Sequence, residues 1–319
     1  MSLRTLKRFF LTTFVLIAGL LTGLAGLAYT APVWTIEQLS QVARNQAGLI
    51  TKSVQVDQHR MVYLTNRQPV ADAPTVVMVH GFGANKDIWL GMAALLNDIN
   101  LIIPDMPAAG SSSYYHDTRY DAVSQVRRLH GLITQLTDAP VVMVGNSLGG
   151  YLTTVYASLY PEQIDSIVLF NNAGVDSAAQ RSQFVQAFDQ GHNLLIPHDE
   201  TGFDRMMELV FSQPPYLPLV VKQVFMQRTF RETLRKQHIF EDSLRHFIPL
   251  EPLLTHLSQP LTVVWGQDDQ VFDVSTAARI LKLQPKAVVT VLEHIGHVPL
   301  IEAPLVSANL LRSHLQQNI

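Results

Sequence analysis

The order of apolar and polar positions along the chain predicts an α/β fold. Continuous apolar runs, such as 75–80 and 141–145, are typical of strands buried on both faces of a parallel sheet. Segments with helical periodicity separate these runs, and such alternation predicts a mostly parallel sheet flanked by helices. The predicted strands are Met61–Leu64, Thr75–His80, Leu101–Asp105, Val141–Gly145, Ile164–Phe170, Leu261–Trp265 and Ala287–Leu292, and the predicted helices are Lys86–Asn97, Tyr120–Leu136, Leu148–Leu159, Ser275–Leu283 and Leu305–Leu315.

One long stretch interrupts this alternation. Between Gly174 and Pro260 the sequence contains no clear buried strand, although much of it is compatible with helix. It is too long for a simple loop. The pattern therefore predicts a helical cap at 175–259, inserted between the two parts of the core, 56–174 and 260–319. Its methionines and aromatic residues either line an adaptable apolar pocket or pack the cap onto the sheet.

The N-terminal segment predicts a membrane helix. Three cations within the first eight residues precede the run Phe9–Tyr29, which contains no charged residue. About 20 such residues span a bilayer as a helix, and the cations favour a cytoplasmic N-terminus. We therefore expect residues 1–31 to form a single-pass anchor, followed by a polar, helix-compatible lead-in at 32–55. The alternative is a signal peptide cleaved at the small residues 26–28.

Either interpretation of the N-terminus places the globular part on the non-cytoplasmic side of the membrane. This side is the periplasm if the source is a Gram-negative bacterium. Cleavage of the segment would make the protein periplasmic or secreted.

Composition excludes several classes of function. Hydrophobic residues make up 47% of the 319 residues and charged residues 15%, so a sizeable core is expected and disorder is not. The net charge of −3 leaves no basic footprint, so no nucleic-acid partner is predicted. The absence of cysteine excludes disulfides and thiol catalysis. The 12 histidines show no H-E-x-x-H spacing, so neither a metal site nor a cofactor is predicted.

A candidate nucleophile lies between a predicted buried strand and a predicted helix. The segment G-N-S-L-G, with Ser147 at its centre, fits the G-x-S-x-G pattern in that context. A sharp strand-to-helix turn exposes the serine hydroxyl above the sheet. Alone, the serine could be an ordinary turn residue, because a hydroxyl needs a base before it acts as a nucleophile.

Candidates for the base and its acidic partner follow later strands. His294 and His297 both come after the last predicted strand, and Gly296 suits a tight loop before His297. Asp268 and Asp269 follow the strand that ends at Trp265. The carboxyl ends of parallel strands are where the sites of such sheets gather. Either carboxylate could therefore fix the tautomer of the histidine.

The segment H-G-F-G, residues 80–83, directly follows a predicted strand and could form an oxyanion hole. The backbone N–H of Phe82, together with that of Leu148, could bind a developing negative oxygen. The same glycines, with Asp105 further on, resemble half of a dinucleotide-binding fingerprint. The third glycine of that fingerprint is replaced by Lys86, so we reject a nucleotide site.

These motifs together resemble the α/β-hydrolase superfamily, and they are similar to its membrane-anchored monoacylglycerol lipases of the abhydrolase-domain type. The resemblance runs from about residue 55 to the end and rests on H-G-F-G-A-N-K-D-I-W-L, G-N-S-L-G-G, W-G-Q-D-D-Q-V-F-D-V-S and G-H-V-P-L-I-E-A-P. It implies Ser147 as nucleophile, Asp269 as acid and His297 as base, with Phe82 and Leu148 as oxyanion donors. The chain order serine, aspartate, histidine is the order of this fold.

One loop departs from the family pattern, because Ala108 and Ala109 stand where relatives usually carry glycine and histidine. The resemblance implies a cofactor-free serine ester hydrolase that acts on a lipid-like ester such as a monoacylglycerol. Two alternatives remain: a hydrolase of carbon–carbon bonds in ring-cleavage products, and a catalytically silent binding protein on the same fold.

Overall fold

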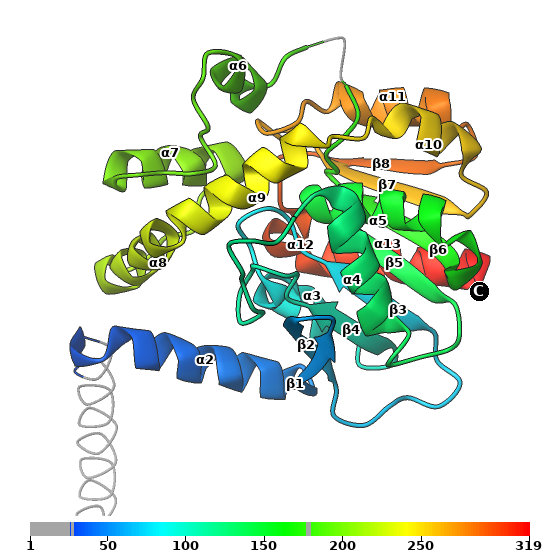
Figure 1. Cartoon of the computed structure of the whole chain (residues 1–319), viewed down its shortest axis with the longest axis horizontal. Coiled ribbons are helices and arrows are strands. Elements are labelled where there is room, and N and C mark those ends of the chain that lie inside the picture. Colours follow the sequence, from blue (N-terminus) through cyan, green and yellow to red (C-terminus); the bar gives the residue numbers. More distant parts are fainter. Residues whose placement is uncertain (1–25, 27–28, 177–179) are drawn as a thin grey trace, which may run out of the picture.

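The computed structural model describes residues 26, 29–176 and 180–319, and its core is a single twisted sheet (Figure 1). The described strands follow the spatial order β1-β2-β4-β3-β5-β6-β7-β8. All neighbours from β4 to β8 pair in parallel, whereas β2 runs antiparallel to both β4 and β1. The bounds are β1 Leu49–Val56, β2 His59–Asn66, β3 Thr75–Val79, β4 Asn100–Pro104, β5 Val141–Asn146, β6 Ile164–Phe170, β7 Leu261–Gly266 and β8 Val288–Leu292.

Helices cover both faces of this sheet and form a separate lobe beside it (Figure 1). The described α-helices are α2 Pro32–Gln46, α3 Leu90–Ala93, α4 Ala122–Ile133, α5 Leu148–Leu159, α6 Gln183–Asp189, α7 Glu200–Val210, α8 Leu219–Arg231, α9 Thr233–Arg245, α10 Leu250–His256, α11 Ser275–Leu283, α12 Pro299–Glu302 and α13 Pro304–Asn318. Helices α4, α5, α10 and α11 share one apolar core with the sheet, and α3 and α13 share the other.

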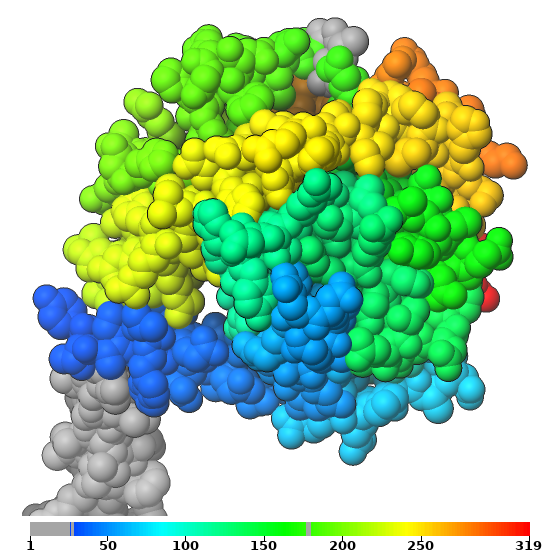
Figure 2. Space-filling view, in the orientation of Figure 1, coloured from blue at the N-terminus to red at the C-terminus, as the bar shows by residue number. Residues whose placement is uncertain are grey.

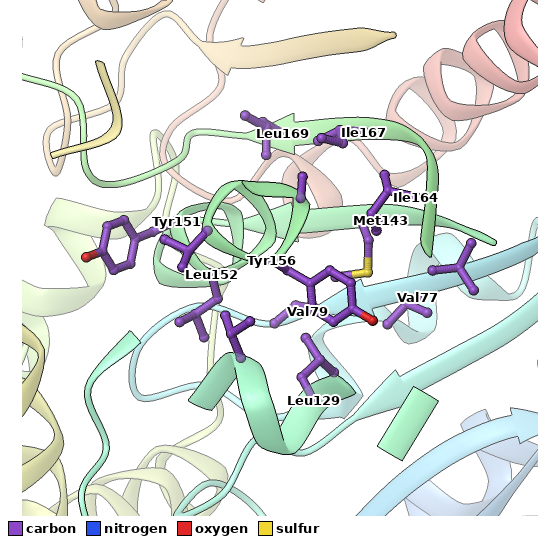
Figure 3. Close-up of a cluster of buried hydrophobic side chains, with 14 of the residues drawn as sticks. Val77, Val79, Leu129, Met143, Tyr151, Leu152, Tyr156, Ile164, Ile167 and Leu169 are labelled. Atoms are coloured by element: carbon purple, nitrogen blue, oxygen red, sulfur yellow. The ribbon is translucent and has the colours of Figure 1, made fainter. Parts of the chain in front are cut away.

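The first of these cores explains the continuous apolar runs of the sequence. Met143 of β5 shares this core with Leu129 of α4 and Tyr156 of α5 (Figure 3). Its neighbours Val142 and Val144 belong to the core on the opposite face. Successive strand residues point to opposite faces, so a strand covered on both sides must be apolar at every position. The predicted mostly parallel sheet with flanking helices is confirmed.

The expected lead-in at 32–55 differs from the structure, because only its first part is helical. Residues Leu49–Val56 form strand β1 instead, which pairs along its full length with β2. A two-residue turn at Asp57 and Gln58 joins the strands, and Asp57 adopts a φ of +50°. Because β1 is an edge strand and half of its residues are exposed, its sequence lacks the apolar run that identifies a buried strand.

The predicted helix Lys86–Asn97 is also shorter in the structure. A 3₁₀ turn at Lys86–Trp89 precedes α3, which ends at Ala93. The N–H groups of Leu95 and Leu96 donate to carbonyls only three residues back, at 3.0 Å in both cases. Such tight turns end an α-helix.

Between β6 and β7 the described residues form helices α6–α10 and no strand. Helices α6 to α9 make up the lobe that overhangs the sheet (Figures 1 and 2), and we call these four helices the cap. Helix α10 falls within the predicted insertion, but Leu250 and Leu254 bury it in the sheet core. The sequence pattern cannot separate the two roles, because amphipathic helices of a cap and of a core have the same periodicity.

The predicted membrane anchor lies almost entirely outside the described residues, which include only 26 and 29–31 of its 31 positions. None of the helices in the described ranges is long and apolar enough to cross a membrane. Helix α2, which follows, contacts α8 of the cap (Figure 2).

Candidate active site

Ser147 occupies a strained turn between β5 and α5. Its φ is +56° and its ψ is −121°, a backbone conformation that non-glycine residues rarely adopt. Close approach of β3 and β5 to α5 requires glycine on both sides. A β-carbon at Gly149 would lie 2.1 Å from the carbonyl oxygen of Val79, and one at Gly145 would lie 2.4 Å from that of Gly149. The G-x-S-x-G pattern therefore reflects packing as well as the turn itself.

His297 and Asp269 form a buried pair at the carboxyl ends of β8 and β7. The Nδ1 atom of His297 lies 2.9 Å from Oδ2 of Asp269. An ionised carboxylate can only accept, so Nδ1 carries the hydrogen and Nε2 is left as the basic nitrogen. Side-chain exposure is 6% for His297 and 0% for Asp269.

Asp269 is held in place by three further donors. Its Oδ1 accepts the backbone N–H groups of Val271 at 2.8 Å and Phe272 at 3.1 Å. Its Oδ2 accepts the side-chain amide of Asn171 at 2.6 Å, in addition to the bond from His297. All four groups that are hydrogen-bonded to the Asp269 carboxylate are thus donors, which suits an ionised carboxylate.

Ser147 and His297 line one cavity of 360 Å³ beneath the cap. Phe82 and Asn146 lie in its wall on the sheet side. Apolar side chains from α7, α8 and the loop between them form much of the opposite wall: Phe203, Met206, Met207, Val210, Phe211, Pro215, Leu217 and Phe225. The cavity is therefore a largely apolar chamber that contains a serine and a histidine.

The two predicted oxyanion donors belong to segments that adjoin Ser147. Leu148 is the first residue of α5, where an N–H group has no partner within the helix. Phe82 follows β3 in the loop that lies against Ser147, because a β-carbon at Gly81 would be 3.0 Å from the serine Cβ. The ring of Phe82 packs against Phe240 of α9, with 5.5 Å between the ring centroids.

His80 orients the peptide that carries the Phe82 amide. Its Nε2 accepts the backbone N–H of Met106 at 3.1 Å, so Nδ1 donates to the carbonyl of Gly81 at 2.8 Å. Burial lowers the pKa of His80, which keeps the ring neutral as this pattern requires. The carbonyl of Gly81 and the N–H of Phe82 belong to one planar peptide, so holding the first fixes the direction of the second.

The rival candidates lie elsewhere. Asp268 is exposed, and its Oδ2 accepts the hydroxyl of Ser212 at 2.7 Å. His294 is exposed in the turn after β8 and adopts a φ of +60°. Neither lines the cavity that contains Ser147.

The rejected dinucleotide fingerprint has a structural explanation. Lys86 and Asp105 form a buried ion pair with 2.9 Å between Nζ and Oδ2. Asp105 also accepts the backbone N–H groups of Lys86 and Ser111, each at 2.8 Å. These bonds connect the loop after β3 to the loop after β4, and they occupy the carboxylate that the fingerprint would assign to a ribose.

Glu302 is a site residue that the sequence motifs did not assign. Its two carboxylate oxygens accept the N–H groups of Gly296 at 2.9 Å and Ser212 at 2.8 Å. The N–H of His297 donates to the carbonyl of Val210 at 2.8 Å. Burial raises the pKa of Glu302. The histidine loop is therefore bonded to the end of α7 in the cap.

Comparison with known proteins places the chain in a family. Residues 74–304 match the model of the alpha/beta hydrolase fold family. The chain belongs to the α/β-hydrolase fold family. It is 35% identical to lipase 1 of Psychrobacter immobilis over 84% of this chain and 85% of that protein. It is 29% identical to monoacylglycerol lipase ABHD6 of Homo sapiens over 84% of this chain and 82% of that protein.

The structure of this hydrolase is similar to that of a bacterial membrane phospholipase A. The TM-score is 0.86 at 33% identity, and the alignment covers 98% of each chain. These relatives confirm the predicted family and its resemblance to monoacylglycerol lipases. The chain is accordingly an enzyme, a serine hydrolase of the lipase and esterase type.

Proposed function

We propose that this hydrolase cleaves lipid-like carboxylic esters, such as monoacylglycerols, through the triad Ser147, His297 and Asp269. The hydroxyl of Ser147 attacks the ester carbonyl while Nε2 of His297 takes its proton. The N–H groups of Phe82 and Leu148 stabilise the oxyanion. His297 then protonates the leaving alcohol, and a water activated by the same ring releases the acid from the acyl-enzyme.

The observation that carries the proposal is the shared cavity. Ser147 and His297 line one chamber, and His297 is hydrogen-bonded to the buried Asp269 on the far side of its ring. Asp269 has the role of fixing the tautomer and stabilising the imidazolium that forms. His80, Asn171 and Glu302 are positioning residues, since each acts through another residue of the site.

The substrate class is supported by the wall of the cavity and by the relatives. Phenylalanine and methionine side chains of the cap surround the space next to Ser147. Unbranched methionines adapt to flexible apolar chains. The relatives include proteins named lipase and monoacylglycerol lipase, and these names denote enzymes that act on lipid esters.

The same proposal includes an N-terminal membrane anchor with the catalytic domain on the non-cytoplasmic side. The charge-free run Phe9–Tyr29 supports it. Tyr29, which precedes α2, and Val33 and Trp34, in its first turn, are exposed by 76%, 49% and 54%. Tyrosine and tryptophan favour the membrane–water interface. Carbonate-washed membranes should retain the full chain and lose a variant without residues 1–31, and protease added to spheroplasts should digest the catalytic domain.

The function is tested with the full chain in detergent, as wild type and as Ser147→Ala. Both proteins are assayed on p-nitrophenyl esters of increasing chain length and on monoacylglycerols. We expect ester turnover by the wild type and its loss in the variant at unchanged thermal stability. A wild type that reacts with a fluorophosphonate yet turns over no ester would favour the carbon–carbon bond hydrolase. A wild type inert in both assays would favour the binding protein.

A further inference from the structure

The catalytic cavity contains a cation that the proposed reaction does not use. Lys236 of α9 is only 7% exposed, and its side chain lines the same chamber as Ser147 and His297. Among the described residues that line the chamber, it is the only lysine, arginine, aspartate or glutamate. A charged side chain in an apolar chamber is costly unless an opposite charge meets it.

No neighbouring carboxylate fully meets that charge. The only described carboxylate within 4 Å of the ammonium is Glu232, whose Oε2 lies 3.7 Å from Nζ, beyond hydrogen-bond distance. Glu232 is also paired with Arg235, with 2.5 Å between Oε1 and Nη2. Two cations thus share one carboxylate, and the local charge is positive. Burial lowers the pKa of Lys236, which is the effect expected of a poorly solvated ammonium.

The ammonium lies next to the oxyanion loop. A β-carbon at Gly83 would be 3.7 Å from Nζ of Lys236, and Gly83 directly follows Phe82. Besides Ser147, the uncharged polar residues Asn85, Asn146 and Thr229 line the chamber together with it. The chamber therefore combines polar side chains, Lys236 among them, with the apolar wall formed by α7 and α8.

We propose that Lys236 binds a phosphate group on the alcohol part of the lipid substrate, so that the enzyme prefers an acylglycerol phosphate to the corresponding neutral acylglycerol. This inference rests on the proposed ester hydrolysis and refines its substrate class. A phosphate in the chamber supplies the missing negative charge. Hydrogen bonds between ionised partners are the strong ones, especially where water is excluded.

The test compares two substrates that differ only in the phosphate, 1-oleoylglycerol and 1-oleoylglycerol 3-phosphate. Both are presented to the full chain in the same nonionic detergent micelles at equal mole fraction. The readout is the ratio of kcat/KM for the phosphorylated substrate to kcat/KM for the neutral one. In Lys236→Met, we expect this ratio to fall by about 10- to 100-fold, with most of the change in KM. In Lys236→Arg, which keeps the charge, the ratio should recover in part.

The matched control is Lys222→Met. Lys222 is also in the cap, but its ammonium is paired with Glu200 at 2.9 Å and Asp204 at 2.8 Å, and it does not line the chamber. The kcat/KM ratio of Lys222→Met should equal that of the wild type. This result would exclude a general effect of the charge of the cap on binding to the micelle. Lys236→Met should also melt at a higher temperature than the wild type, because it replaces an incompletely paired buried charge by an apolar chain of similar length.

Two outcomes would overturn the inference. The ratio could stay constant in Lys236→Met, or kcat/KM could fall equally for both substrates, which would mean that Lys236 acts on the ester common to both. Failure of the proposed function gives a different result, since the wild type would then hydrolyse neither substrate.

Discussion

Replacement of Asp269 by asparagine tests the assigned triad, because the hydrogen bonds that this change disturbs can be counted. Four donors converge on this carboxylate: two backbone N–H groups on Oδ1, and the side chains of Asn171 and His297 on Oδ2. An asparagine has one acceptor oxygen, so in either orientation its NH₂ group faces two of these donors. His297 can relieve one conflict by moving its hydrogen from Nδ1 to Nε2, and that tautomer cannot take a proton from Ser147.

The expected cost has two parts. With the new NH₂ group facing His297 and Asn171, the Asn171 amide remains unpaired and lowers the free energy of unfolding by about 1–3 kcal/mol, the cost of one buried unsatisfied group. The wrong tautomer lowers kcat by about 10⁴-fold. Urea unfolding measures the first part, and hydrolysis of a p-nitrophenyl ester measures the second.

Asp268→Asn is the matched control, because Asp268 is adjacent but exposed and accepts from Ser212. It should retain kcat within about threefold and unfold at nearly the same urea concentration, since exposed substitutions change stability by about 0.5 kcal/mol or less. The assignment is refuted if Asp269→Asn keeps kcat within tenfold of wild type, or if Asp268→Asn is the variant that loses activity.

Three further substitutions test the packing and charge around the site. Gly149→Ala should lower the free energy of unfolding by about 3 kcal/mol or more, because its β-carbon meets the Val79 carbonyl at 2.1 Å, whereas Gly91→Ala, with 3.5 Å to Pro304, should not destabilise the protein in urea. Glu302→Ala leaves the Gly296 and Ser212 amides unpaired and should cost about 2–4 kcal/mol and lower kcat, whereas the exposed Glu293→Ala should do neither. Burial lowers the pKa of His314 to about 4, so its contribution to stability is present above pH 6.5 and is lost as the pH falls toward 4. Between pH 7 and pH 4.5, urea unfolding should therefore show about 2–3 kcal/mol less acid destabilisation in His314→Gln than in the wild type. A reduction of the same size in the exposed His256→Gln would contradict this.

Elements buried on both faces could be predicted from the sequence. The strand ending at Phe170 contains the apolar run Ile167–Phe170, and the one beginning at Leu261 contains the run Val263–Trp265, so their position in a parallel sheet follows from these runs alone. The elbow around Ser147 could also be predicted, because the G-x-S-x-G pattern between a buried strand and a helix is a local sequence signal. Strand β1 could not, since an edge strand lacks the apolar signal and its pairing depends on β2.

Residues whose roles depend on long-range contacts could not be predicted from the sequence. Lys236 has no motif, and only the packing of α9 onto the oxyanion loop brings it to the chamber. Glu302 belongs to a quoted motif, but its bond to Ser212 depends on where α7 of the cap ends. Asn171 did carry a signal, because it directly follows a buried strand at the edge of the sheet where sites gather.

The central claim is that Ser147 is an activated nucleophile, and fluorophosphonate labelling with mass spectrometry tests it most directly. The full chain in detergent is treated with the probe, its intact mass is measured, and the modified peptide is sequenced. The account predicts one adduct per chain on Ser147, slower labelling in Asp269→Asn and none in Ser147→Ala. An adduct on another serine, or equal labelling of Ser147→Ala, would contradict it.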